Sequence, residues 1–219
     1  MIDITKNLIP SFLDRSYCSE LQFYHPENCI FNKINKDWTI IAERTAANGK
    51  PQFFSGILLS INKGKGIVFS GSKGEITLKA RFDNLRGAFP AAWLLPYQNK
   101  DGRIYEIDIF EWISQESKYI QMCHHWGTNY KEGHKIGKRK AKGSWHDYHI
   151  YQLKWNKCFM WWKIDGKFRK IIFNRYRNQR FYLLINLAIG GWAEDPLLSQ
   201  NRFTMNVKNV QASQFILLQ

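Results

Sequence analysis

The chain has 219 residues, of which 44% are hydrophobic and 23% charged, and these fractions exclude a disordered, collagen-like or coiled-coil protein. A net charge of +14 attracts nucleic-acid phosphate, anionic lipid and anionic polysaccharide alike, so charge alone does not choose a partner. We expect one domain over 1–219 with a real core, while an aromatic content of 16%, including nine Trp, calls for a further explanation.

Membrane spans and export signals are not expected. No segment offers the roughly 18 apolar residues that a membrane-spanning helix needs, and the start of the chain lacks the charged-then-apolar order of a signal peptide. Cys18, Cys29, Cys123 and Cys158 show no CxxC spacing, which argues against zinc and thioredoxin-like sites. Two interpretations of the cysteines stay open: a Cys18–Cys29 disulfide in an oxidising compartment, or four buried free thiols.

Short apolar runs rich in β-branched and aromatic residues recur along the chain, each bounded by Gly, Asn, Asp or Lys. Their spacing predicts a mostly β protein, a sandwich or barrel of antiparallel strands. The expected strands are 38–42, 55–61, 66–69, 75–82, 91–95, 105–111, 119–125, 149–155, 159–164, 181–188 and 202–211. Asp165-Gly166, after the strand 159–164, predicts a type I′ hairpin turn, because both positions of that turn need positive φ.

One segment between expected strands concentrates positive charge. Its basic residues are Lys131, Lys135, Lys138, Arg139, Lys140 and Lys142, interspersed with Gly133, Gly137 and Gly143 and opposed only by Glu132. Two interpretations stay open here as well: a solvated, mobile loop, or a loop that binds an anion.

The most informative stretch is 105–112, Tyr-Glu-Ile-Asp-Ile-Phe-Glu-Trp, which places three carboxylates in an otherwise apolar and aromatic strand. Side chains two residues apart share a face of a strand, so Glu106 and Asp108 point the same way. A one-residue β-bulge between Asp108 and Glu111 would bring Glu111 to the same face. All three carboxylates would then line one surface.

Chemistry supplies a reason for this clustering. Retaining glycosidases need an ionised carboxylate and a carboxylic acid roughly 5–5.5 Å apart, and a third carboxylate raises the pKa of its neighbours by like-charge repulsion. An exposed polar edge strand fits poorly with the interleaved Ile, Phe and Trp residues. A calcium site is the other rival, but calcium usually draws its ligands from flexible loops.

Residues 106–111 resemble the ExDxxE signature of glycoside hydrolase family 16, in the bulged form associated with laminarinases, agarases, porphyranases and carrageenases. Segment 87–96 resembles the family's G-x-W-P-A-x-W-L-L-P, with Phe89 where Trp is usual. Segment 148–155 resembles its F-H-x-Y-x-x-E-W strand, and segment 186–192 its N-L-A-V-G-G sequence. The order and spacing of these motifs match from about residue 28 to residue 210.

The resemblance implies an all-β jelly-roll sandwich of two antiparallel sheets, with a concave substrate cleft crossed by the carboxylate strand. It implies that Glu106 is the nucleophile, that Glu111 is the general acid/base, and that Asp108 holds and tunes Glu106. It also implies an extracellular or periplasmic location. Two departures from the family pattern stand out: the N-terminal edge is shortened, and Asn206 stands where many members bind a structural calcium through Asp. We therefore expect no cofactor and no metal at the site residues, with a structural calcium as the weaker alternative.

Aromatic residues gain a role from this resemblance, because sugar rings stack on indole rings. The candidates for substrate contacts lie in or beside the matching segments: Trp93, Trp112, Trp126 and Trp192, with one of His124 and His125, and also Asn186 and Arg81. Trp38, Trp155 and one of the pair Trp161–Trp162 are expected in the core.

The predicted function is that of an endo-acting retaining glycosidase for a β-linked polysaccharide, either a β-1,3-glucan or a red-algal galactan. The basic excess favours an anionic, sulfated chain, although a high pI also serves solubility. A transglycosylase on the same scaffold and a non-catalytic carbohydrate-binding protein are the alternatives. A nucleic-acid partner ranks last, because it would be repelled by the carboxylate strand, and a monomer with no membrane partner is expected.

Overall fold

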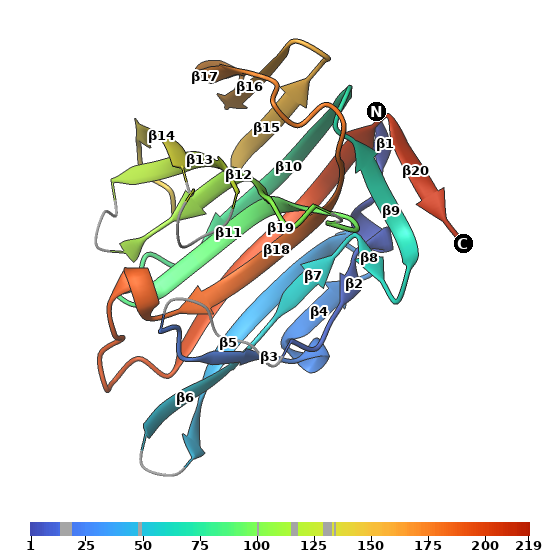
Figure 1. Cartoon of the computed structure of the whole chain (residues 1–219). Helices are drawn as coiled ribbons and strands as arrows, with labels where there is room; N and C mark the ends of the chain where they lie inside the picture. Colours follow the sequence, from blue (N-terminus) through green and yellow to red (C-terminus); the bar gives the residue numbers. More distant parts are fainter. Residues whose placement is uncertain (14–18, 48–49, 100, 115–117, 129–132, 134) are drawn as a thin grey trace.

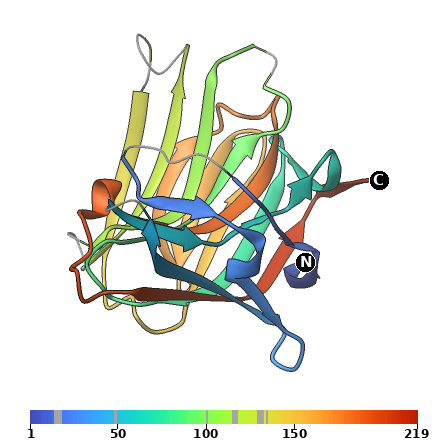
Figure 2. The same ribbon diagram turned by 90° about the horizontal axis from the view of Figure 1, so that it is seen from below.

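A computed structural model of the chain describes residues 1–13, 19–47, 50–99, 101–114, 118–128, 133 and 135–219. Regular structure in these ranges consists of β-strands and short 3-10 turns, and none of their helices is long and apolar enough to cross a membrane. The strands form two sheets that lie in two layers, as Figures 1 and 2 show from two directions. The predicted all-β sandwich is confirmed, and its ladders are antiparallel except for one short parallel pair.

We call the two layers the β10 sheet and the β12 sheet. The β10 sheet contains, in spatial order, β17 (Lys167–Phe173), β16 (Phe159–Ile164), β15 (His149–Trp155), β10 (Gly74–Phe82), β19 (Arg202–Ser213), β5 (Asp37–Ala47), β6 (Lys50–Ser55) and β3 (Gln22–Tyr24), with β1 (Ile2–Asp3) beside β19 and β4 (Cys29–Asn32) beside β5. The β12 sheet contains β14 (Lys135–Lys142), β13 (Tyr119–Gly127), β12 (Ile104–Trp112), β11 (Ala88–Pro96), β18 (Arg180–Ile189), β7 (Ile57–Leu59) and β2 (Ile9–Pro10), with a branch made of β9 (Lys65–Ser70), β8 (Ile61–Asn62) and β20 (Phe215–Leu218).

Every strand expected from the sequence is present, with 55–61 divided between several strands. The strands that were not expected are short, or lie at the edges of the sheets. The prediction of a mobile loop over the basic segment is wrong from Lys135 to Lys142, because these residues form β14, which pairs with β13 along its length. Lys131 and Glu132 lie outside the described residues.

Aromatic side chains fill the space between the sheets. From the β10 sheet, Phe82 packs against Phe110 and Trp112 of β12, with ring centroids 6.2 and 5.1 Å apart. The Tyr151 ring of β15 stacks on Phe110 at 4.1 Å. Trp38, Trp155 and Trp162 are also buried, which confirms their predicted place in the core.

Two further predictions are decided by local geometry. Asp165 and Gly166 have φ values of 50° and 72° and join β16 to β17 as a two-residue turn, so the predicted type I′ hairpin is confirmed. Cys29 and Cys123 are buried free thiols, whereas Cys158 is exposed, so the expectation of burial is wrong for Cys158. Cys18, the other half of the disulfide considered above, lies outside the described residues.

Candidate active site

A β-bulge in β12 places the three carboxylates on one face. Trp93 of β11 lies opposite Asp108, yet Ala92 lies opposite Phe110, so β12 contains one extra residue between them. The same irregularity appears against β13, between Ile107 and Glu111. The predicted bulge is thus confirmed, and Glu106, Asp108 and Glu111 share the outer face of the β12 sheet, which we call the carboxylate face.

His125 of β13 connects two of the carboxylates. It lies opposite Glu106 in the ladder, and its Nε2 lies 3.4 Å from Glu106 Oε1 and 3.2 Å from Asp108 Oδ2. The Asp108 side chain is buried, whereas Glu106 retains about a fifth of its exposure, at 19%. One imidazole therefore holds the accessible carboxylate beside the buried one.

Glu111 has different surroundings from Glu106. Burial raises the pKa of Glu111 to about 7, the charge of Asp108 adds to this shift, and a hydrogen bond with the Cys123 thiol opposes it. Burial also raises the pKa of Asp108, against the pull of the Lys170 and Lys138 charges. Glu111 is consequently suited to keep a proton near neutral pH.

The strand is supported from the core side by groups of the β10 sheet. Trp162 of β16 donates from Nε1 to the carbonyl oxygen of Asp108 at 2.8 Å. The Lys170 ammonium of β17 donates to the carbonyl oxygens of Met122 and Gly137 and lies 4.6 Å from the Trp162 ring centroid. These contacts hold the backbone of β12 and of its neighbours β13 and β14 from below, with a cation beneath β13 and β14.

Trp93 lies on the carboxylate face and is held by a polar network. Its Nε1 donates to Asn186 Oδ1 at 2.8 Å, and Asn186 Nδ2 donates to the Tyr24 hydroxyl at 2.8 Å. Gln22 Nε2 donates to the same hydroxyl at 3.0 Å. Trp93 is half-buried, so part of its ring faces outward beside Asp108, while Asn186 is buried and acts on Trp93 from beneath.

Trp192 lies at one end of the same face. It belongs to a 3-10 turn, η4 (Gly191–Ala193), that follows β18, and it is 62% exposed. The turn packs on the carboxylate face through Ala193, in a small cluster with Phe89 and Ile113. An exposed indole at this position extends the face beyond the end of β12.

Three residues predicted to contact substrate, Trp112, Trp126 and Arg81, lie elsewhere, and those predictions are wrong. Of His124 and His125, one of which was expected at the substrate, His125 lies on the carboxylate face. Trp112 is fully buried in the core against Phe82. Because neighbouring residues of a strand point to opposite faces, His124 and Trp126 lie on the side of β13 away from His125, where their rings stack at 4.8 Å and Trp126 packs against the core. Arg81 belongs to the β10 sheet and points outward there, its Nε donating to Asn206 Oδ1 at 3.1 Å.

The surroundings of Asn206 do not suit a calcium ion. Its amide oxygen, the atom that would have to serve as a ligand, accepts a hydrogen bond from the Arg81 guanidinium. Its amide nitrogen donates to Thr39 Oγ1 at 2.9 Å. A guanidinium in that place repels a divalent cation, so no step below depends on calcium.

Sequence reasoning missed Cys123 and Lys138. Cys123 precedes His125 by two residues on an expected strand, so alternation alone places its thiol on the same face. Lys138 lies opposite Cys123 on β14, and it could not be placed because that segment was interpreted as a loop.

Comparison with known proteins gives consistent results. The family model "Glycosyl hydrolases family 16" matches residues 36–208. Glucan endo-1,3-beta-glucosidase A1 of Niallia circulans is 28% identical over 142 residues, 54% of this chain and 20% of that protein. Beta-glucanase of Rhodothermus marinus is 25% identical over 195 residues, 78% of this chain and 65% of that protein. The chain thus spans less than two thirds of the length of either relative.

Among solved structures, LamAcat from Zobellia galactanivorans superimposes with a TM-score of 0.79 at 20% identity, covering 95% of this chain and 92% of that one. At this level of identity the likeness establishes a shared fold. It agrees with the jelly-roll sandwich of two sheets predicted from the sequence.

Proposed function

Since the chain belongs to glycosyl hydrolase family 16, we propose that this glycoside hydrolase is an endo-acting, retaining enzyme that cleaves internal β-linkages of a polysaccharide. The observation that carries the proposal is the bulge that brings Glu106, Asp108 and Glu111 to one face, with His125 shared between two of them. Both curated relatives are named for the cleavage of β-glucans, which favours a β-glucan such as a β-1,3-glucan as substrate.

The surroundings of the carboxylates suggest their roles. Glu106 is half-buried and its Oε1 lies 3.4 Å from the imidazole of His125, so we assign it to attack the anomeric carbon as the ionised carboxylate. Glu111, with its pKa raised to about 7, is suited to protonate the departing glycosidic oxygen and then to accept a proton from water. Asp108 orients His125 and, through it, Glu106.

Sugar-binding roles follow from position on the carboxylate face. Trp93, held by Asn186, offers an indole beside Asp108, and Trp192 offers an exposed indole at the end of the face. We assign these two as platforms for sugar rings. A substrate of this kind lies outside cells, so an extracellular or periplasmic location is part of the proposal.

The stereochemical course of the reaction tests the mechanism. Proton NMR of fresh digests is expected to show the β-anomer of the product first, because two displacements restore the configuration. Glu106→Gln is expected to abolish turnover while the near-ultraviolet circular dichroism stays native. An α-anomer as first product, or near-native rates for Glu106→Gln, would overturn the assignment. Oligosaccharides longer than the substrate would indicate a transglycosylase instead.

One feature favours an anionic substrate as a second candidate. On β14, Lys138, Lys140 and Lys142 lie opposite Cys123, Gln121 and Tyr119, so alternate lysines share the side of His125. This row continues the carboxylate face with positive charge, and ammonium groups pair well with sulfate. A sulfated galactan would gain from such a row, whereas a neutral glucan would not.

A panel of laminarin, lichenan, agarose, porphyran and carrageenans separates the two candidates by reducing-end release. For a sulfated chain, Lys140→Gln/Lys142→Gln is expected to raise KM at least severalfold and to reduce its salt dependence, since two sulfate contacts are lost. Lys63→Gln/Lys65→Gln, which removes the same charge from the turn after β8 and the first residue of β9, is the matched control. Cleavage of laminarin with unchanged KM in both double variants would support the neutral glucan.

A further inference from the structure

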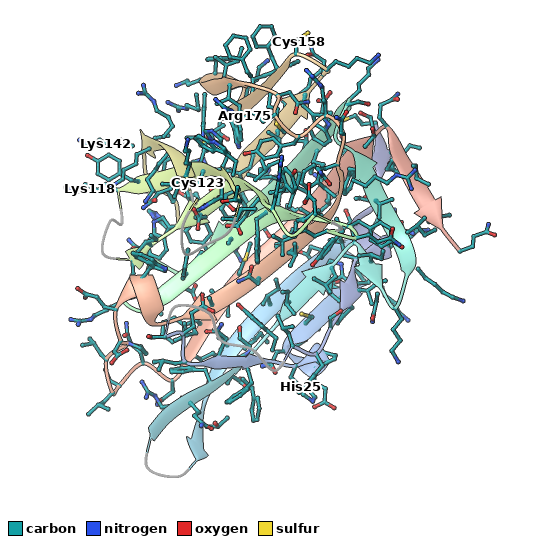
Figure 3. All side chains as sticks on the ribbon, viewed as in Figure 1. His25, Lys118, Cys123, Lys142, Cys158 and Arg175 are labelled. Atoms are coloured by element: carbon teal, nitrogen blue, oxygen red, sulfur yellow. The ribbon has the colours of Figure 1, made fainter. Side chains whose placement is uncertain are left out.

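Cys123 is a thiol that the proposed reaction does not use, and it lies among nitrogen and oxygen donors. One donor atom each of Asp108, Cys123 and His125 falls within 4.8 Å of the others. Figure 3 shows Cys123 in the middle part of the β12 sheet, whereas Cys158 lies at the far end of the molecule near β16. The fold therefore brings Asp108 of β12 together with Cys123 and His125 of β13.

The bulge and the strand alternation together explain this gathering. Cys123 and His125 are two residues apart on β13 and share a face. The extra residue of β12 shifts the register between Ile107 and Glu111, so that Asp108 faces both of them across the ladder. The three donors stand on two rigid, hydrogen-bonded strands, which limits the cost of ordering them around an ion.

Asp108 carries an unsatisfied oxygen that points to a ligand. The residue is only 2% exposed, and its Oδ2 accepts no hydrogen bond from the described residues. The imidazole Nε2 of His125 lies 3.2 Å away and also lies 3.4 Å from Glu106 Oε1. A buried carboxylate oxygen without a hydrogen bond is costly, and a bound cation would remove that cost.

We propose that Asp108, Cys123 and His125 bind Zn²⁺ and that the ion switches the catalytic centre off. The Cys123 thiol loses its proton to solvent and binds through Sγ, His125 binds as the neutral imidazole through the Nε2 lone pair with its proton on Nδ1, and Asp108 binds through Oδ2. Water takes the fourth tetrahedral position. Donor atoms around zinc lie roughly 3–4 Å apart, so side-chain shifts of about 1 Å complete the set.

The donor set selects the metal. Thiolate and imidazole suit zinc, whereas calcium and magnesium prefer oxygen ligands alone. A bound zinc ion would hold His125 and Asp108 away from Glu106 and would take the Cys123 thiol from its hydrogen bond with Glu111. A protein molecule with zinc bound at this site is therefore expected not to turn over substrate.

Metal binding itself is the primary measurement, so failure of the proposed hydrolase activity would not obscure it. Calorimetric titration of the whole chain with Zn²⁺ is expected to give one site with proton release, and Ca²⁺ no comparable binding. Even the loss of a residue that only supports a metal ligand typically lowers metal affinity by about 10–100-fold. Cys123 is itself a ligand in this proposal, so Cys123→Ser and Cys123→Ala are expected to weaken Zn²⁺ binding at least about tenfold. Cys158→Ser, which removes an exposed thiol, is the matched control and is expected to bind as the unaltered chain does.

Cobalt spectroscopy covers the case in which the Cys123 variants fold poorly. The Cys158→Ser protein loaded with Co²⁺ is expected to show a thiolate-to-metal absorption band, and Zn²⁺ is expected to bleach it. Absence of that band, or equal Zn²⁺ affinity with and without the Cys123 thiol, would overturn the proposal. In parallel, Zn²⁺ is expected to inhibit turnover, with less inhibition in each Cys123 variant relative to its own zinc-free rate.

Discussion

Glu106 and Glu111 are the same amino acid on the same strand, but their surroundings differ. Both side chains are half-buried, but Glu106 lies beside the imidazole of His125, whereas Glu111 lies beside Asp108 and the Cys123 thiol. The surroundings of Glu111 favour a protonated carboxyl group. The proposed double displacement requires such a group beside an ionised carboxylate.

The raised pKa of Glu111 makes a prediction about pH. Its pKa rises from 4.5 to about 7 on folding, so the folded state holds this proton more tightly than the unfolded state does. The free energy of unfolding should therefore fall as pH rises from about 4.5 to about 7, by up to roughly 3 kcal/mol. Glu111→Gln is expected to abolish this loss, so that thermal unfolding shows a more stable protein at pH 8 and little change at pH 4.

The pH dependence of activity should follow the protonation state of Glu111. If Glu111 is the general acid, as proposed above, kcat/KM of the unaltered protein is expected to decline above about pH 7, where Glu111 loses its proton. Glu27→Gln, which neutralises an exposed carboxylate, is the control for both measurements. An equal gain in stability for Glu111→Gln at pH 4 and pH 8 would contradict the assignment of the shift to Glu111.

Single residues also show what the sequence can and cannot reveal. Alternation along β13 means that only one of His124 and His125 can face the carboxylates, and the ladder with Glu106 selects His125. The burial of Trp112 likewise follows from the bulge, because Trp112 is adjacent to Glu111 and must point the other way. The same alternation places Trp126 on the face opposite His125, whereas Trp93 could be placed only from its pairing with Asp108.

At the scale of elements, β14 is held to β13 by a close fit around one glycine. A Cβ atom at Gly137 would lie 2.0 Å from His124 Cε1 and 2.6 Å from its Nε2, although Gly137 itself has no unusual φ. The His124 ring is in turn stacked on Trp126. The glycine is therefore required by packing and not by backbone conformation.

Gly137→Ala is expected to lower the free energy of unfolding by about 1–3 kcal/mol, because overpacking forces the His124 ring or β14 to move. The double variant Gly137→Ala/His124→Ala removes the opposing ring, so it should be more stable than the sum of the two single changes predicts. Urea denaturation of the four proteins measures this coupling. Additive effects would show that the two side chains do not compete for the same space.

The sequence predicted the bulge in β12 but not the strand β14. The bulge in β12 followed from requiring three acidic side chains on one face, a demand that a regular strand cannot meet. β14 gave no such signal, because Ala141 is its buried hydrophobic residue and lysines occupy both faces. Hydrophobic periodicity marks strands that bury a face, and an edge strand of this kind has almost none.

At the scale of the whole molecule, the two sheets are tied together beneath the candidate active site. The bond from Trp162 Nε1 to the Asp108 carbonyl crosses from the β10 sheet to the β12 sheet at the bulge itself. The Lys170 ammonium crosses the same gap to reach carbonyl oxygens of β13 and β14. The position of the carboxylates thus depends on the opposite layer.

Trp162→Phe tests this dependence. It keeps an aromatic ring but leaves the Asp108 carbonyl without its donor, so we expect a loss of about 1–3 kcal/mol in stability and a clear fall in kcat. Trp155→Phe is the matched control, because Trp155 is equally buried and its Nε1 donates to the Ser70 carbonyl at 2.8 Å, away from the site. Equal kcat values for the two variants, measured alongside chemical denaturation, would contradict the link.

The layer to which a strand belongs was the hardest property to predict. The alternation in 75–82 correctly separates an apolar from a polar face, yet it does not tell which sheet contains the strand. Arg81, a candidate for a sugar contact, belongs to β10 in the opposite sheet and points away from both the core and the carboxylates. Such assignments depend on pairings between strands far apart in the chain, such as β10 with β19.

The lysines of β14 have a consequence that is independent of any substrate. β14 ends the strand order of the β12 sheet, so its outer rim offers backbone N–H and C=O groups to which a strand of another molecule can pair. Closely spaced ammonium groups make such stacking of two copies electrostatically unfavourable. The row is therefore expected to disfavour edge-to-edge aggregation through β14.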